Sequence, residues 1–432
     1  MGLSLGKTAT PGNGAAEEHG VVGSPWPDLP PELAAEILAR LLSHTDRLSF
    51  GVVCRGWRLA AREQGLLLPP SMPWINIGRG AYMDLAGNGK ACRFAAPKGY
   101  RARATFGSWV LYEHDLSSRC FLGDPFSPST PAIEVPCHYK FNAIICHNSV
   151  SMRLCQNGSF LTCPLKKMVV CSPHLIVATS AYNCPLKIAC FRPSNGMAIK
   201  PATLLWSDGD YLHGHQHHAC DFTYKDIAFQ HGKIFALSLT ENLFAYDFAT
   251  EEMWLSQTWS RVEHAIKERP VAAAGAKLDY HNHHLLTSSD KQKLLMVRWR
   301  IPLQEDRTKF DHRPMDLQVF EADLQKGRWS QVKDLGGQAL FIGQTGSRAL
   351  AVGDFSDGMF QANRVFILGD DWALYHASRP WCKCFDCKKL GYKVPSYCVY
   401  DMISGEASLV SLGGRDHCLM KSPKMAWFFP AG

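Results

Sequence analysis

The chain has 432 residues, 46% of them hydrophobic and 20% charged, which is the composition of an ordinary globular protein. Its formal net charge of +7 is spread along the sequence without a dense basic block, so direct nucleic-acid binding is not expected. No apolar run reaches the roughly 18 residues of a membrane span and no signal peptide is evident, so we expect the 16 cysteines to be reduced thiols of a cytoplasmic or nuclear protein.

Residues 1–24 are rich in glycine, alanine and proline and show no hydrophobic period. A segment of this kind cannot bury enough apolar surface to fold, so we predict a disordered tail. The folded part of the chain is expected to begin at residue 25.

The stretch "WPDLPPELAAEILARLL" at residues 26–42 has the pattern of an amphipathic helix. Asp28 can cap the helix, and Pro30 and Pro31 suit its first turn, where a missing amide hydrogen costs nothing. Apolar residues then recur at helical spacing and predict one apolar face. They are Leu33, Ile37, Leu38 and Leu41.

A second helix is predicted after the break at "SHT", where Ser43 or Thr45 can serve as the cap. Its apolar positions are Leu48, Val52, Val53 and Trp57, with Ala60 and Ala61 behind them. The helical module spans residues 25–68, and a unit of about 40 residues rarely buries its own apolar faces. We therefore expect the rest of the chain, or a partner, to complete its core.

From residue 74 the pattern changes to short apolar runs separated by Gly, Pro, Asn and Asp. "KDIAFQHGKIFALSLTENLFAYDF" predicts three strands joined by "HGK" and "TEN" turns, and "HHLLTSSDKQKLLMVRW" and "MDLQVFEADLQKGRWSQVKDL" predict hairpins. Units of this kind, repeated every 30–60 residues or so, are typical of a β-propeller. We predict a mainly β fold, with six or seven irregular blades over residues 74–420; two β-sandwich domains are the alternative.

Two clusters have the residue types of a metal site. One comprises Cys382, Cys384, Cys387 and Cys398, and it has one C-x-x-C pair where zinc sites commonly have two. The other comprises His213, His215, His217 and His218, with "HNHH" at 281–284 as a similar stretch in which Asn282 favours a turn. Exposed thiols and polar loops are the simpler interpretation, so we expect no metal and no cofactor.

The order of residues in the helical module resembles an F-box. The residues that match are Leu29, Pro30, Leu33, Ile37, Leu38, Leu41, Leu48, Val53, Cys54, Trp57 and Arg58. The β part resembles the plant F-box proteins with a KIB-type β-propeller. The stretches that carry this resemblance are "GSWVLYEHD", "LGDPFSPSTPAIEVP", "DIAFQHGKIFALSLTENLFAYD" and "LLTSSDKQKLLMVRW". Together the two resemblances cover roughly residues 26 to 412.

The resemblance implies a substrate receptor of a Skp–cullin–F-box ubiquitin ligase, a targeting subunit that is not itself an enzyme. The module would bind a Skp-type adaptor, and through it a cullin–RING ligase, while the propeller would recruit an unidentified target protein. The expected adaptor-binding residues are Leu29, Pro30, Leu33, Ile37, Leu38, Leu41, Leu48, Val52, Cys54 and Trp57. The alternatives are a propeller enzyme or ligand-binding protein with a purely structural module, and a non-degradative F-box scaffold.

Overall fold

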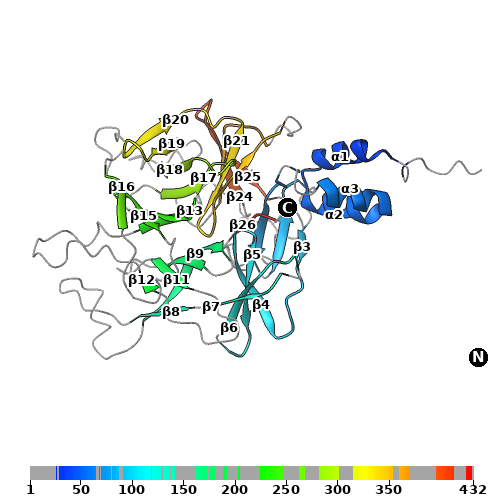
Figure 1. Cartoon of the computed structure of the whole chain (residues 1–432), viewed down its shortest axis with the longest axis horizontal. Helices are drawn as coiled ribbons and strands as arrows, with labels where there is room; N and C mark the ends of the chain where they lie inside the picture. The colour runs from blue at the N-terminus through cyan, green and yellow to red at the C-terminus, as the bar shows by residue number, and fades with distance from the viewer. Residues whose placement is uncertain are drawn as a thin grey trace, which may run out of the picture.

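A three-helix module precedes a series of β-sheets in the computed structural model of the chain (Figure 1). The structure describes residues 26, 29–64, 68, 70–78, 80–86, 91–117, 119–127, 130–136, 138–141, 161–172, 175–180, 188–191, 203–204, 224–238, 240–247, 262–267, 282–300, 315–353, 360–368, 396–412 and 425–430. The predicted tail, residues 1–24, lies outside these ranges. Within them, no helix combines the length and apolar character needed to cross a bilayer.

The helices are α1 (Pro31–Arg40), α2 (His44–Val53) and α3 (Arg55–Gln64). Helix α1 begins after Pro30 with Pro31 in its first turn, and Pro30 makes no side-chain capping bond. Asp28, the predicted cap, lies outside the described residues. Ser43 caps α2, and its hydroxyl accepts a hydrogen bond from the Asp46 amide at 3.2 Å. One of the two predicted caps of α2 is therefore confirmed.

The prediction of a single second helix is wrong, because the chain breaks at Cys54. This residue is extended (φ −154°, ψ 177°), and its Sγ accepts a hydrogen bond from the Trp57 amide at 3.4 Å. Its carbonyl accepts the Arg58 amide at 3.1 Å, so Cys54 acts as the N-cap of α3. Val52 and Val53 precede the break, and β-branched residues of this kind are weak helix formers.

The β part contains six sheets in the described residues. Five are blades formed by consecutive strands, namely β4–β7, β8–β12, β13–β16, β17–β20 and β21–β25. The sixth has the order β26-β1-β2-β3 and so joins the two ends of the domain. Figure 1 shows the sheets following one another around a centre, and the inner strands of neighbouring sheets are in contact. This arrangement is a β-propeller and not a pair of β-sandwiches.

The strands have the following residue ranges, given sheet by sheet. In the sixth sheet and the first blade they are β1 (Trp74–Gly78), β2 (Ala81–Asp84), β3 (Ala91–Arg93), β26 (Ala426–Phe428), β4 (Tyr100–Phe106), β5 (Trp109–His114), β6 (Arg119–Gly123) and β7 (Ile133–Pro136). The second and third blades comprise β8 (His138–Phe141), β9 (Leu161–Ser172), β10 (Leu175–Ser180), β11 (Ile188–Phe191), β12 (Thr203–Leu204), β13 (Tyr224–Gln230), β14 (Lys233–Ser238), β15 (Leu243–Asp247) and β16 (Val262–Ile266). The remaining blades comprise β17 (Asn282–Thr287), β18 (Leu294–Arg300), β19 (Asp316–Asp323), β20 (Arg328–Val332), β21 (Gln338–Gly343), β22 (Arg348–Ala351), β23 (Arg364–Leu368), β24 (Ser396–Asp401) and β25 (Ala407–Ser411).

Strand β26 closes the ring by pairing antiparallel with β1. Trp74 lies opposite Phe428, and Ile75 lies opposite Trp427. The indole Nε1 of Trp427 donates to the Ile342 carbonyl on β21 at 2.9 Å, and the Phe429 amide donates to the Gly107 carbonyl at 3.0 Å. The chain at β26 therefore contacts the sheets on both sides of it. Strand β26 lies beyond residue 420, which we had predicted as the end of the propeller domain.

The helical module is attached to the sixth sheet through the chain that joins α1 to α2. The Leu42 carbonyl accepts the Met72 amide at 3.0 Å, and Ser43 Oγ donates to Asp84 Oδ2 at the end of β2 at 2.6 Å. The His44 ring lies against Phe126 and Trp74, with centroid distances of 4.3 and 6.4 Å. Residues 41–45 together with these four propeller residues are called "the junction".

Burial of His44 in the junction makes the stability of the fold depend on pH. Burial, followed by the charge of Arg47, lowers the pKa of His44 from 6.5 to about 4. The unfolded chain therefore takes up the proton first, so stability falls as the pH drops from 6.5 towards 4, by up to about 1.4 kcal/mol per pH unit. We expect His44→Phe to remove this contribution. The free energy of unfolding in urea, measured for both proteins at pH 7 and at pH 5, tests this expectation. The wild type should lose more stability between the two pH values than His44→Phe does, and an equal loss in both proteins would contradict it.

Candidate functional site

The helical module carries most of the exposed large apolar side chains. Among the described residues, nine such side chains are exposed, and six of them belong to the module. They are Trp26, Leu33, Leu48, Val52, Val53 and Leu59, which we call the exposed apolar set. Val52 is 72% exposed although it lies inside α2. The other three, Leu116, Leu324 and Ile403, lie in separate turns of the propeller, and scattered single residues of this kind are normal.

The helical module has a small core of its own, and the apolar residues that do not fit into this core stay exposed. Ala34, Leu38, Phe50 and Ala60 are buried together, and Leu29, Ile37, Leu41 and Trp57 are half-buried around them. The Trp57 ring stacks on Phe50 at a centroid distance of 4.4 Å. Its Nε1 donates to the Trp26 carbonyl at 3.0 Å, which fixes the chain that enters α1. Three short helices therefore bury only part of one another's apolar surface.

The ten predicted adaptor-binding residues divide into three groups. Pro30, Leu33, Leu48 and Val52 are exposed. Leu29, Ile37, Leu41, Cys54 and Trp57 are half-buried, and Leu38 is inside the core. Three members of the exposed apolar set were not among the predicted adaptor-binding residues, namely Trp26, Val53 and Leu59. Leu59 follows the break at Cys54, which was not predicted. Because a new helix begins there, the helical spacing assumed for a single helix did not place Leu59 on the exposed face.

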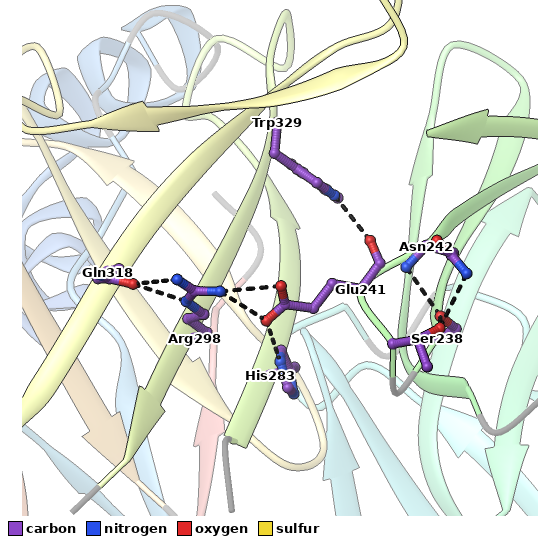
Figure 2. Close-up of polar contacts among 8 residues, drawn as sticks. Ser238, Glu241, Asn242, His283, Arg298, Gln318 and Trp329 are labelled. Carbon is purple, nitrogen blue, oxygen red and sulfur yellow. Dashed lines mark hydrogen bonds and ion pairs between the residues drawn. The ribbon is translucent and has the colours of Figure 1, made fainter. Parts of the chain in front are cut away.

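A buried polar network joins two blades of the propeller (Figure 2). Glu241 lies in the turn between β14 and β15, and its Oε1 is 2.9 Å from His283 Nε2 on β17. Arg298 on β18 donates to both carboxylate oxygens at 3.1 and 3.2 Å, and to Gln318 Oε1 on β19. The indole of Trp329 on β20 donates to the Glu241 carbonyl at 2.9 Å. One glutamate is thereby bound to every strand of the neighbouring blade but β19, which it reaches through Arg298.

A carboxylate beside a histidine and an arginine is also a combination found in active sites. Burial alone would raise the pKa of Glu241, but the hydrogen bond from His283 and the charge of Arg298 lower it, so the carboxylate stays ionised. The side chains of Glu241 and His283 are 1% and 0% exposed. Neither can touch a substrate in this conformation, so we assign the network to the attachment of one blade to the next.

Lys167 and Asp226 form a second buried pair, between β9 and β13. Their Nζ–Oδ1 distance is 2.7 Å. The other Asp226 oxygen accepts the Leu285 amide on β17 at 2.7 Å, and Lys167 donates to the Leu285 carbonyl at 3.3 Å. Three neighbouring inner strands are thus held by one ion pair, which again places buried charge at the contacts between blades.

The predicted metal-binding clusters lie largely outside the described residues. This applies to Cys382, Cys384 and Cys387, and to His213, His215, His217 and His218. Cys398 is fully buried on β24, and burial raises the pKa of its thiol. The stretch at 282–284 is part of β17, so the predicted turn at Asn282 is wrong. In the part of the chain that the structure describes, no three His, Cys, Asp or Glu residues are grouped to hold a metal ion.

The cysteine prediction is corrected at one position. Cys54, Cys92, Cys171 and Cys398 are free thiols, as expected. Cys120 on β6 is disulfide-bonded, so the expectation of reduced thiols is wrong for this residue. It lies in the apolar cluster of the first blade, which also contains Leu111, Leu122 and Val135.

Two family profiles match the chain. The profile described as KIB1-4 beta-propeller matches residues 82–401, and the profile described as F-box-like matches residues 26–67. The F-box-like match ends after α3 and the propeller match begins within β2, so residues 68–81, which include β1, lie between the two matches. A search among curated proteins returned no match.

Several solved structures share a weak similarity with the chain. Apo AztD from Citrobacter koseri is 9% identical, with a TM-score of 0.32, over 83% of this chain and 98% of that one. Kluyveromyces lactis Hsv2 is 11% identical, with a TM-score of 0.26, over 58% of this chain and 74% of that one. Because these scores are low, the fold assignment rests on the sheets of the chain itself and on the two profiles.

Proposed function

The chain belongs to the KIB1-4 β-propeller family and carries an F-box-like module, and on this premise we propose that it is a substrate receptor of a Skp–cullin–F-box ubiquitin ligase. F-box domains in general bind Skp-type adaptors. In this proposal the module binds such an adaptor, and the propeller recruits a target protein in the cytoplasm or nucleus. The chain performs no bond chemistry itself, since its contribution is to raise the effective concentration of target lysines near the ligase.

The exposed apolar set is the observation that supports this proposal. Burying one large apolar side chain is worth about 1.5–3 kcal/mol, so the six together give a gross gain on the order of 10 kcal/mol. Association costs of similar size are subtracted from this gain. The six side chains therefore offset much of the cost of association, and further contacts with the adaptor supply the rest of a stable interface. Such an interface also explains why the module leaves Leu33, Leu48 and Val52 in water, which costs free energy in the isolated chain.

The proposal predicts that Leu33→Asp and Val52→Asp weaken binding of a Skp-type adaptor at least tenfold, because each places a charge in an apolar interface. Both residues are exposed in the free chain, so folding should be preserved. Titration calorimetry with purified adaptor is the measurement. Ile403→Asp is the matched control, since Ile403 is 79% exposed but lies in the turn between β24 and β25.

Three outcomes are informative. Loss of binding in both module variants, with the control unchanged, supports the adaptor-binding role. No binding by the folded wild-type chain would overturn the proposal and favour a propeller protein with a purely structural module. Adaptor binding without ubiquitylation of any bound protein in a reconstituted ligase would instead favour a non-degradative scaffold.

A further inference from the structure

The chain between α1 and α2 is packed into the propeller and is not a free linker. Leu42 packs against the apolar cluster of the sixth sheet and its neighbour, which includes Met72, Met83 and Trp427. The backbone bond from the Met72 amide to the Leu42 carbonyl adds a fixed direction to this contact. Leu42 and Ser43 therefore belong to the helical module by sequence but make their main contacts with the propeller.

Asp84 provides the polar part of the junction. One carboxylate oxygen accepts the Ser43 hydroxyl at 2.6 Å and the Thr45 hydroxyl at 3.4 Å, while the other accepts the Ala86 amide at 3.0 Å. Ser43 and Asp84 are 2% and 3% exposed, so water does not compete for their bond. Ser43 is also the N-cap of α2, and a carboxylate at this end of a helix is favoured by the helix dipole.

His44 extends the junction to a second sheet. Its ring lies edge-on to Trp74 of β1 and to Phe126, which follows β6 in the first blade. Phe126 is itself held in its turn, because its amide donates to Asp124 Oδ1 at 2.9 Å. The module therefore contacts two adjacent sheets through three kinds of interaction that act in different directions: a backbone bond, a buried carboxylate and an aromatic contact.

From these contacts we infer that the helical module and the propeller form one rigid body, with Asp84 as the residue that fixes their relative orientation. The exposed apolar set then keeps a constant position relative to the propeller. A protein bound to the module would consequently lie at a fixed distance and angle from a ligand bound at a given site of the propeller. The inference concerns the free chain, so it can hold or fail independently of the proposed adaptor.

Hydrogen exchange measured by mass spectrometry on the full chain tests the inference. In the wild type we expect strong protection of peptides covering residues 41–47 and 70–73. Asp84→Ala should raise exchange in these peptides at least tenfold and leave α3 unchanged, because α3 is held by the module's own core. Asp316→Ala is the matched control. Asp316 pairs with Arg300 between two strands of one blade, at 3.0 Å, and does not belong to the junction.

A distance measurement separates rigidity from local protection. Dyes attached through noncanonical residues at Glu63 on α3 and Glu406 before β25, both exposed, report the orientation by single-molecule energy transfer. The wild type should give one narrow distribution and Asp84→Ala a broad one. If Asp84→Ala impairs folding, Ser43→Ala removes the same contact from the other side. A broad distribution in the wild type, or exchange unaffected in both variants, would overturn the inference.

Discussion

Glu241→Ala is expected to lower the free energy of unfolding by about 3–5 kcal/mol, the usual cost of removing one partner from a buried ion pair. The substitution leaves the Arg298 guanidinium buried without the carboxylate that it shares with His283. It also removes one of the side-chain links between the blades β13–β16 and β17–β20 (Figure 2), while the bond from the Leu285 amide to Asp226 remains. Urea denaturation followed by tryptophan fluorescence, with 12 tryptophans as reporters, gives the measurement.

The control for this prediction is a glutamate with the same charge and a different environment. Glu321 pairs with Lys293 at 3.0 Å, but the two side chains are 32% and 53% exposed. Exposed pairs contribute little, so Glu321→Ala should cost no more than about 1 kcal/mol. Glu241→Gln keeps the size of the side chain and removes its charge, so its loss of unfolding free energy should lie between the losses of Glu241→Ala and Glu321→Ala. Equal effects of Glu241→Ala and Glu321→Ala would show that the network does not stabilise the fold.

Trp427→Ala is expected to cost about 3–5 kcal/mol as well, because it opens a cavity in the core at the closure of the ring. Trp427 is fully buried, and its ring lies 5.3 Å from that of Phe341 and 6.0 Å from that of Tyr397. The change also leaves the Ile342 carbonyl without its indole donor. The midpoint of thermal unfolding is the measurement.

Trp427→Phe isolates the hydrogen bond from the packing. Phenylalanine keeps most of the apolar contact but cannot donate to the Ile342 carbonyl, so we expect a loss of about 1–3 kcal/mol. A smaller loss for Trp427→Ala than for Trp427→Phe would contradict the cavity argument. A loss confined to local exchange of β26, with no shift of the midpoint, would show that ring closure is not part of the cooperative unit.

Hairpins and turns could be predicted from the sequence because their signals are local. The "HGK" turn joins β13 to β14, and His231 and Gly232 both have positive φ (47° and 76°), as a two-residue hairpin turn requires. The "SSDKQ" and "DLQKGR" turns lie where predicted, between β17 and β18 and between β19 and β20. The type of each element was encoded within a few residues of it.

Features that depend on distant residues could not be predicted. The parallel pairing of β21 with β23, and the pairing of β26 with β1, have no local signal. The network around Glu241 collects side chains from turns and strands of two blades, and "HNHH" gave no sign that His283 would meet a glutamate. For the candidate site, helical spacing identified the apolar residues of the module, but it could not place Leu38 inside and Val52 outside, since that depends on how three helices pack.

The pairing of β26 with β1 also has a consequence for how the chain is made. Translation proceeds at roughly 5–20 residues per second, so β1 leaves the ribosome roughly 20–70 s before its partner strand does. Until then β1 has an open edge, and Trp74 lacks Phe428, whose ring lies 6.3 Å away in the finished fold. Unpaired edges are sites of aggregation. We therefore expect a product that stops short of residue 426 to keep this edge open and to aggregate more readily than the full chain.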